Sequence, residues 1–244
     1  TFDWGPADFP GMTLVPSSWD MHSDVSLIIL EHLPNTLLLI GAANLLIFFL
    51  GIPLALQVGS RKRGQWLDRF ITLLSPVSSI PSWIHGILLV AVFAAWLRLL
   101  PFGGKYDNLP PESEWRYLLV VGKHMILPVA AILMGMFFQL VYVWRTYLVL
   151  YSDEDYVDLA VAKGVDKRQL EQKYILRPSM PYILTSFALT LVGFWQMTTA
   201  LEYFFNWPGI GQLYVRALPN FRGEQYYVGE MGIIISVVAL FAYL

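Results

Sequence analysis

Long runs of uncharged residues alternate with short charged stretches along this chain. A helix rises about 1.5 Å per residue, so roughly 20 apolar residues cross the hydrocarbon core of a bilayer, which is about 30 Å thick. The first run, residues 33–58, is 26 residues long and carries no charge. Further apolar runs occupy residues 70–97, 125–144, 178–201 and 227–244. The pattern predicts an all-α polytopic membrane protein with five transmembrane helices, the last of which the chain is expected to end inside.

Composition assigns the chain to the membrane class on independent grounds. Of its 244 residues, 56% are hydrophobic and 14% are charged, and the mean hydropathy is +0.54. A soluble domain carries about 25% charged residues, so this surface needs lipid to cover it. The sequence contains no cysteine, which excludes disulfides and thiolate metal sites.

The distribution of charge predicts the orientation. Arg61, Lys62, Arg63 and Arg69 follow the first run, and short basic loops stay cytoplasmic. Residues 1–32 contain no Lys or Arg and are rich in Gly, Pro and acidic residues, so we expect an irregular extracytoplasmic segment before a transmembrane domain at 33–244. The amino end is expected outside and the carboxyl end inside.

Two interruptions of the apolar pattern are also expected to shape the fold. Pro76 and Pro81 remove backbone donors from the second run, which predicts a kink or a broken start near its cytoplasmic end. Residues 98–123 carry mixed charges with several Pro and Gly, which predicts an extracytoplasmic loop.

A charged hairpin, residues 152–178, lies between the third and fourth runs. It is predicted to form two short helices joined by Gly164 in the left-handed conformation. The expected signals are a capping box of Ser152 with Asp155, a second cap of Asp166 with Gln169, and Pro178 closing the second helix. On the first helix, Val157, Ala160 and Val161 share a narrow apolar face that suits docking into another protein's groove. The alternative is an ordinary solvated loop.

A second motif, residues 202–217, ends the fourth run with glycine and aromatic residues. Trp207 suits a membrane interface, Pro208 and Gly209 predict a turn, and Gly211 allows close backbone approach, so we expect a short re-entrant segment at the outer mouth. The carboxylate of Glu202 either lines this mouth or holds the segment in place. The alternative is an ordinary interfacial turn.

Few residues in the sequence suggest chemistry. Gln139 and Gln196 lie inside predicted spans, where a polar side chain faces either another helix or a pathway. The sequence contains no phosphate-binding G-x-x-x-x-G-K-[ST] motif, and its four histidines show no ligand spacing. We therefore predict no catalytic residue, no metal site and no cofactor in this chain, and we expect no nucleic acid partner.

Both motifs resemble those of one family. Asp158, Leu159, Ala160 and then Gly164 resemble the E-A-A-x-x-x-G signature of ABC importer permeases, with Asp158 in place of Glu and Leu159 in place of the first Ala. Residues 202–211 resemble the E-x-x-F-x-W-P-G-x-G stretch of the oligopeptide/dipeptide permease family. The two motifs agree in order, spacing and predicted side of the membrane.

The resemblance implies a permease subunit that imports a solute by alternating access across a prokaryotic cytoplasmic (inner) membrane. The implied partners are a second permease, two cytoplasmic ATPase subunits that carry ATP and magnesium, and an extracytoplasmic solute-binding protein. The ATPase-coupling residues would be Asp158, Leu159, Ala160, Val161 and Gly164. Family members usually have six spans, so the first would be missing here. The solute could be a peptide, nickel or an oligosaccharide. The alternative is a channel or membrane scaffold with a protein-docking cytoplasmic loop.

Overall fold

The computed structural model describes residues 25–59, 65–106 and 113–217. Within these ranges, the side chains of residues 25–28, 65, 194–196 and 216–217 are outside the description. The described residues form helices and connecting turns, and none of them lies in a β-strand.

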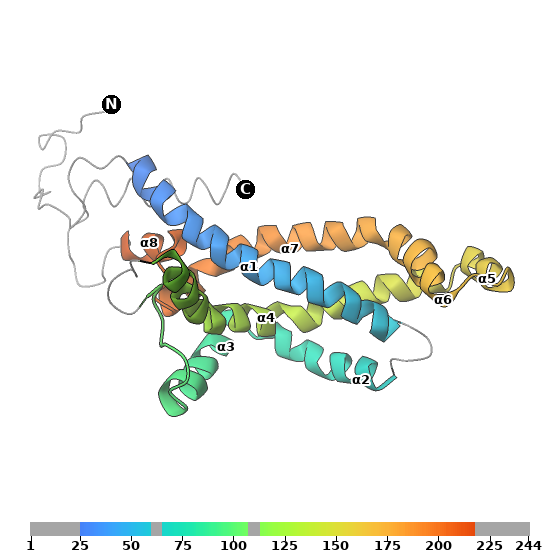
Figure 1. The fold of residues 1–244 in the computed structure, drawn as a ribbon, viewed down its shortest axis with the longest axis horizontal. Helices are drawn as coiled ribbons and strands as arrows, with labels where there is room; N and C mark the ends of the chain where they lie inside the picture. Colours follow the sequence, from blue (N-terminus) through green and yellow to red (C-terminus); the bar gives the residue numbers. More distant parts are fainter. Residues whose placement is uncertain (1–24, 60–64, 107–112, 218–244) are drawn as a thin grey trace, which may run out of the picture.

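Three long helices run side by side along the longest axis of the molecule (Figure 1). They are α1 (Val25–Gly59), α4 (Glu114–Ser152) and α7 (Arg177–Phe204). α1 and α4 contain stretches long and apolar enough to cross a membrane, at Ile29–Gly59 and Glu114–Ser152. A third such stretch, Lys167–Gly193, begins before α7 and includes its first part. The described residues hold three such helices, or four if one bent pair is counted as a span. The predicted fifth span, 227–244, lies outside the described residues.

An aromatic cluster joins the three long helices. The ring of Trp144 on α4 lies 6.2 Å from that of Phe48 on α1 and 6.2 Å from that of Phe187 on α7. The indole Nε1–H donates to the hydroxyl of Ser186 at 2.9 Å, which satisfies the polar atom of this fully buried side chain. Gly51 allows the close approach, because a Cβ there would lie 2.7 Å from the Trp144 ring. This contact fixes α1 against α4 and α7.

The second apolar run is bent rather than straight. It forms α2 (Gln65–Leu74), the 3₁₀ turn η1 (Ser75–Ser79), α3 (Ser82–Leu89) and the π-helix η2 (Val90–Trp96). The two halves meet at an angle of 98°. The kink expected from Pro76 and Pro81 is confirmed, because both prolines lack an N–H. The expected span over 70–97 is present as a bent pair of helices, which makes one span only if its two halves are counted together.

Hydrogen bonds to α4 support this break. The hydroxyl of Ser78 donates to the carbonyl of Met134 at 3.0 Å, and the hydroxyl of Ser75 donates to Oε1 of Gln139 at 3.2 Å. Both bonds are made by side-chain hydroxyls of the 3₁₀ turn, so they fasten the break to α4.

Two helix starts differ from the expected boundaries. Residues 25–32 belong to α1, so this part of the segment 1–32 is helical rather than irregular. Residues 114–123 belong to α4, so the expected loop 98–123 ends at Ser113, which caps the helix with extended backbone. A helix of 39 residues is about 58 Å long. The helix α4 is therefore longer than the bilayer core is thick, and it extends as far as the hairpin.

The hairpin lies at one end of the molecule and a short helix at the other (Figure 1). The hairpin comprises α5 (Asp155–Ala162), α6 (Lys167–Gln169) and the π-helix η3 (Leu170–Leu176), which continues directly into α7. Pro178 lies in the first turn of α7, where a missing N–H is tolerated, so the expected end of the second helix at Pro178 is wrong. At the opposite end, α8 (Ile210–Ala217) follows α7 after a turn.

Candidate functional site

The hairpin begins differently from the expected capping box. Ser152 is the last residue of α4, and its hydroxyl donates to the carbonyl of Val149 at 2.8 Å. The N-cap of α5 is Glu154, whose side chain makes no capping hydrogen bond. The predicted pairing of Ser152 with Asp155 is therefore wrong, because α4 continues through Ser152. Asp155 and Asp158 still lie in the first turn of α5, where negative side chains interact favourably with the positive end of the helix dipole.

The turn after α5 has the predicted glycine geometry. Gly164 has a φ of +75°, its N–H donates to the carbonyl of Val161 at 3.0 Å, and the N–H of Val165 donates to the carbonyl of Ala160 at 3.1 Å. This pair of bonds is a Schellman motif. Asp166 is the N-cap of α6 as expected, but its carboxylate accepts from the N–H of Arg168, at 3.1 Å, instead of pairing with Gln169. The hairpin thus has a defined reversal between its two helices.

The apolar face predicted for docking is divided between the inside and the outside of the protein. Val157 and Ala160 are each only 3% exposed, and α5 packs against η3. Leu159 and Val161 are each 55% exposed, and Asp158 is exposed beside them. The expectation that Val157 and Ala160 face a partner is wrong, because their stripe is covered by the second helix of the same hairpin.

A tyrosine ties the two hairpin helices together. The hydroxyl of Tyr156 on α5 donates to the carbonyl of Tyr174 on η3 at 2.9 Å. Partial burial, with the nearby carboxylate of Glu154 as the second cause, raises the pKa of Tyr156 above its usual value. The phenol therefore keeps the proton that it donates, and the hairpin keeps this bond at neutral pH.

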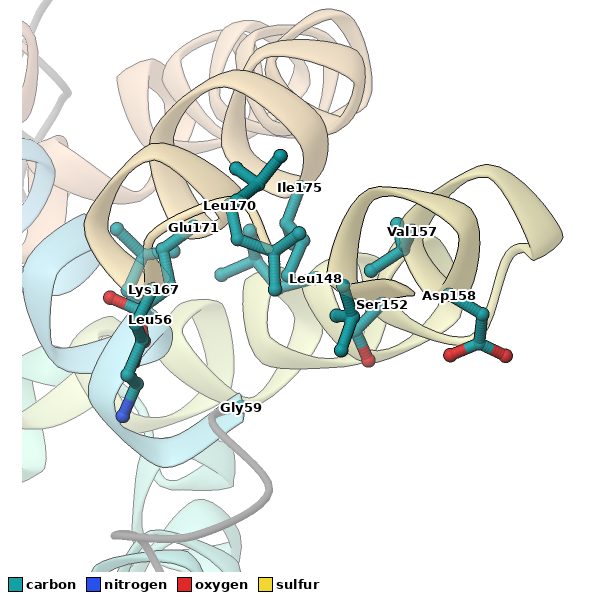
Figure 2. A pocket seen from close by; sticks show the side chains of 12 residues that line it. Leu56, Gly59, Leu148, Ser152, Val157, Asp158, Lys167, Leu170, Glu171 and Ile175 are labelled. Carbon is teal, nitrogen blue, oxygen red and sulfur yellow. Dashed lines mark ion pairs between the residues drawn. The ribbon is translucent and has the colours of Figure 1, made fainter. Parts of the chain in front are cut away.

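A cavity of about 360 Å³ separates the hairpin from the ends of the spans (Figure 2). Its apolar wall comes from four elements: Leu56 of α1, Leu148 of α4, Val157 of α5, and Leu170 and Ile175 of η3. Charged groups also line it, among them Asp158, Lys167 and Glu171. Because of this cavity, α5 packs on η3 and not on the ends of α1 and α4. The helix α5 therefore has room to shift relative to those ends.

An ion pair lies beside this end of the spans. Nε of Arg145 on α4 lies 2.6 Å from Oδ1 of Asp68 on α2. Since α4 continues from Arg145 to Ser152, the pair connects the bent span to the helix that leads into the hairpin. Sequence reasoning placed both residues on the cytoplasmic side but did not pair them.

The outer turn is organised around a buried carboxylate. Glu202 is 0% exposed, and its Oε2 accepts from the N–H groups of Gly211 at 2.7 Å and Gln212 at 3.3 Å. These donors belong to the first turn of α8, where backbone N–H groups lack helical partners. A Cβ on Gly209 would overlap the Glu202 carboxylate, and one on Gly211 would overlap the backbone of Thr199. The close approach predicted for Gly211 is confirmed, and Glu202 holds the segment.

Two residues of α1 that sequence reasoning did not single out fasten the turn. Nδ2 of Asn35 donates to the carbonyl of Pro208 at 2.8 Å, and its Oδ1 accepts from Nζ of Lys105 at 2.7 Å. The hydroxyl of Thr36 accepts from the N–H of Ile210 at 2.8 Å. A polar Asn-Thr pair in an otherwise apolar run was the available signal.

Trp207 is part of the core and not of an interface. Its side chain is 0% exposed, and the indole Nε1–H donates to the carbonyl of Asn35 at 2.9 Å. The expectation of an interfacial tryptophan is wrong, because α1 supplies the acceptor that water would otherwise provide.

The structure separates the remaining candidates. Gln139 is exposed on α4 and bonded to Ser75, away from both the hairpin and the outer turn, and the side chain of Gln196 lies outside the description. The described part of the chain contains no group of three or more His, Asp or Glu side chains that could hold a metal ion. The site residues thus form two clusters at opposite ends of the spans.

Comparisons with known proteins agree on one family. Residues 47–244 match the family model described as the binding-protein-dependent transport system inner membrane component. The peptide transport system permease protein SapB of Salmonella typhimurium is 25% identical over 235 residues, which cover 86% of this chain and 72% of that protein. The oligopeptide transport system permease protein AppB of Bacillus subtilis is 29% identical over 192 residues, 78% of this chain and 59% of that protein.

A solved structure shares the fold. The MetNI methionine ABC transporter, in inward-facing conformations, matches with a TM-score of 0.63. The match covers 91% of this chain and 94% of that one at 13% sequence identity, so it bears on the fold alone.

Proposed function

The chain belongs to the family of inner-membrane components of binding-protein-dependent transport systems, and we propose that it is the permease subunit of an ABC importer for peptides. The observation that carries the proposal is the family match over residues 47–244, which includes both the hairpin and the outer turn. ATP hydrolysis belongs to separate subunits, and this chain supplies half of the membrane pathway.

The hairpin is the coupling element in this proposal. Its exposed side chains include Leu159, Val161 and Asp158, two apolar side chains beside a carboxylate, on a helix held by the Gly164 reversal. Val161 and Asp158 also line the cavity, and Leu159 does not. An amphipathic helix with such anchors suits a hydrophobic groove on a partner. The ATPase subunit would bind here, and closure of the two ATPases would shift the hairpin into the space that the cavity leaves.

The orientation follows from the same assignment. The hairpin end, with the basic residues around it, faces the cytoplasm, and the outer turn with α8 faces the opposite side. Together with the fifth apolar run, which lies outside the described residues, the chain would have five spans.

A second permease completes the pathway. The candidate span Lys167–Gly193 has 11% of its apolar window buried, against 33% for α1 and 44% for α4. A span so little covered by the described residues has surface available for another subunit or for a passage. An extracytoplasmic solute-binding protein would deliver the solute, and the names of the two relatives favour a peptide.

Association with the ATPase tests this function. Leu159→Glu or Val161→Glu places a charge in the proposed contact, where burial without a partner costs several kcal/mol, so the ATPase should no longer co-purify. The control is Gln172→Glu, an equal charge on the exposed surface of η3, which should leave association unchanged. Full association and peptide-stimulated ATP hydrolysis in both α5 variants would favour the channel or scaffold alternative.

A further inference from the structure

A hollow of about 750 Å³ lies at the outer end of the molecule, beside the turn. It is walled by Trp83 and Ile87 of α3 and by Tyr203 and Phe204 at the end of α7. Asn206 and Gln212, from the turn and from α8, complete it. Its volume is within the range of small-molecule sites, which is about 300–1,000 Å³.

The walls of the hollow are apolar yet accessible. Trp83, Ile87, Tyr203 and Phe204 all remain exposed, so aromatic and aliphatic surface is accessible at this point, although the Phe204 ring also meets that of Phe205 edge to face. Gly86 allows α3 to lie this close to α7, because a Cβ there would lie 2.8 Å from the ring of Phe205. The aromatic walls are therefore held by backbone packing rather than left on a loose loop.

A pair of carboxamides supplies the polar part. Nε2 of Gln212 donates to Oδ1 of Asn206 at 2.6 Å, and Gln212 is buried. Asn206 has a φ of +50°, a conformation that Asn adopts more readily than most residues. The bond and the backbone together fix both amides beside the aromatic surface.

The hollow also lies where a passage would begin. Tyr203 and Phe204 end α7, which includes most of the candidate span that is least buried among the described residues. The other outer candidates are committed internally, since Glu202 accepts from α8 and Trp207 donates to α1.

We infer that this hollow is a contact site for the translocated peptide as it enters the membrane. The aromatic walls receive an apolar or aromatic side chain, and the exposed carboxamide of Asn206, which Gln212 holds in place, bonds the peptide backbone. None of the described residues that line the hollow is charged or is a histidine, which disfavours a nickel ion and favours the uncharged middle of a short peptide. The inference rests on the proposed function and specifies its substrate class.

Selectivity between two tripeptides tests the site. The whole complex, reconstituted in proteoliposomes with saturating loaded binding protein, takes up tritiated Ala-Phe-Ala and Ala-Ala-Ala in parallel. Trp83→Ala should lower the ratio of Ala-Phe-Ala to Ala-Ala-Ala uptake about fivefold, because one aromatic contact is lost. The ratio does not depend on how much protein folds. Trp115→Ala, at an exposed tryptophan of α4 outside the hollow, is the matched control and should leave it unchanged.

A photoactivatable tripeptide, Ala-benzoylphenylalanine-Ala, tests the location in the native complex. Illumination during turnover should attach it to segments 83–87 or 203–206, and excess Ala-Phe-Ala should prevent this. Attachment only to the binding protein or to the second permease, or an unchanged uptake ratio in Trp83→Ala, overturns the inference while peptide uptake still supports the proposed function. Uptake of maltotriose or Ni²⁺ but of neither peptide overturns the substrate class, and the absence of any ATP-coupled uptake contradicts the function itself.

Discussion

Glu202 shows how a single carboxylate is used at the outer end. The sequence left open whether it lines a pathway or holds the following segment, and the structure buries it against two N–H groups of α8. Glycines at 209 and 211 make room for this contact. Each of these three positions of the motif therefore has a role in packing the turn against α7 and α8.

Removal of the Glu202 acceptor should destabilise the outer end. Glu202→Ala leaves the N–H groups of Gly211 and Gln212 buried without a partner, so we expect a loss of about 2 kcal/mol in the free energy of unfolding. Glu202→Gln keeps one acceptor oxygen and should lose less. Thermal unfolding of the purified permease measures both, and equal stability of the native protein and the Ala variant would mean that the contact contributes nothing.

The glycine at 211 should resist even a methyl group. Gly211→Ala places a Cβ against the backbone of Thr199, which cannot rotate away, so a loss of about 1–3 kcal/mol is expected. Gly122→Ala on α4 meets no atom within 4 Å and should be neutral or stabilising by up to about 1 kcal/mol. Thermal unfolding of the two variants measures this difference, and Gly211→Ala should unfold at the lower temperature. A midpoint for Gly211→Ala at or above that of Gly122→Ala would contradict the packing described.

At the scale of the element, local sequence signals predicted the turn and the cap of the hairpin, but they did not predict which of its faces is buried. Gly164 and Asp166 act through bonds within a few residues, so their roles were readable from the sequence. Which apolar stripe faces outward depends on what covers it. Helical spacing grouped Val157, Ala160 and Val161 correctly as neighbours but could not show that η3 covers the first two.

Two substitutions to Glu should separate folding of the hairpin from docking. Ala160→Glu forces a charge between α5 and η3, which costs several kcal/mol and should open the hairpin to limited proteolysis even without the ATPase. Leu159→Glu lies on the exposed face and should leave the proteolysis pattern of the isolated permease unchanged. If Ala160→Glu is as resistant as the native hairpin, the assigned inner face is wrong.

For the whole molecule, the apolar runs predicted a helical membrane protein, and the long helices α1, α4 and α7 follow them. Pro76 and Pro81 predicted a kink but not its angle of 98°, since a missing N–H breaks a helix without fixing the direction of the next one. Nor did the runs predict that Trp207 is buried, since its partner Asn35 lies 172 residues away. Contacts of this range leave no local pattern.

The orientation of the molecule predicts which positions water-soluble reagents reach. Because the chain contains no cysteine, Lys105→Cys and Lys167→Cys each introduce a single thiol. In intact cells an impermeant maleimide should label position 105 and spare position 167. Both should react after permeabilisation, and strong labelling of position 167 in intact cells contradicts the topology.

ATP-coupled uptake is the most direct test of the central claim. Proteoliposomes that contain this permease, its permease partner and the ATPases, with loaded binding protein on the outer-turn side, should accumulate a tritiated tripeptide only with ATP on the hairpin side. Leu159→Glu should abolish this accumulation, and Gln172→Glu should preserve it. Peptide flux that equilibrates without ATP, or accumulation that survives Leu159→Glu unchanged, would contradict an importer driven through the hairpin.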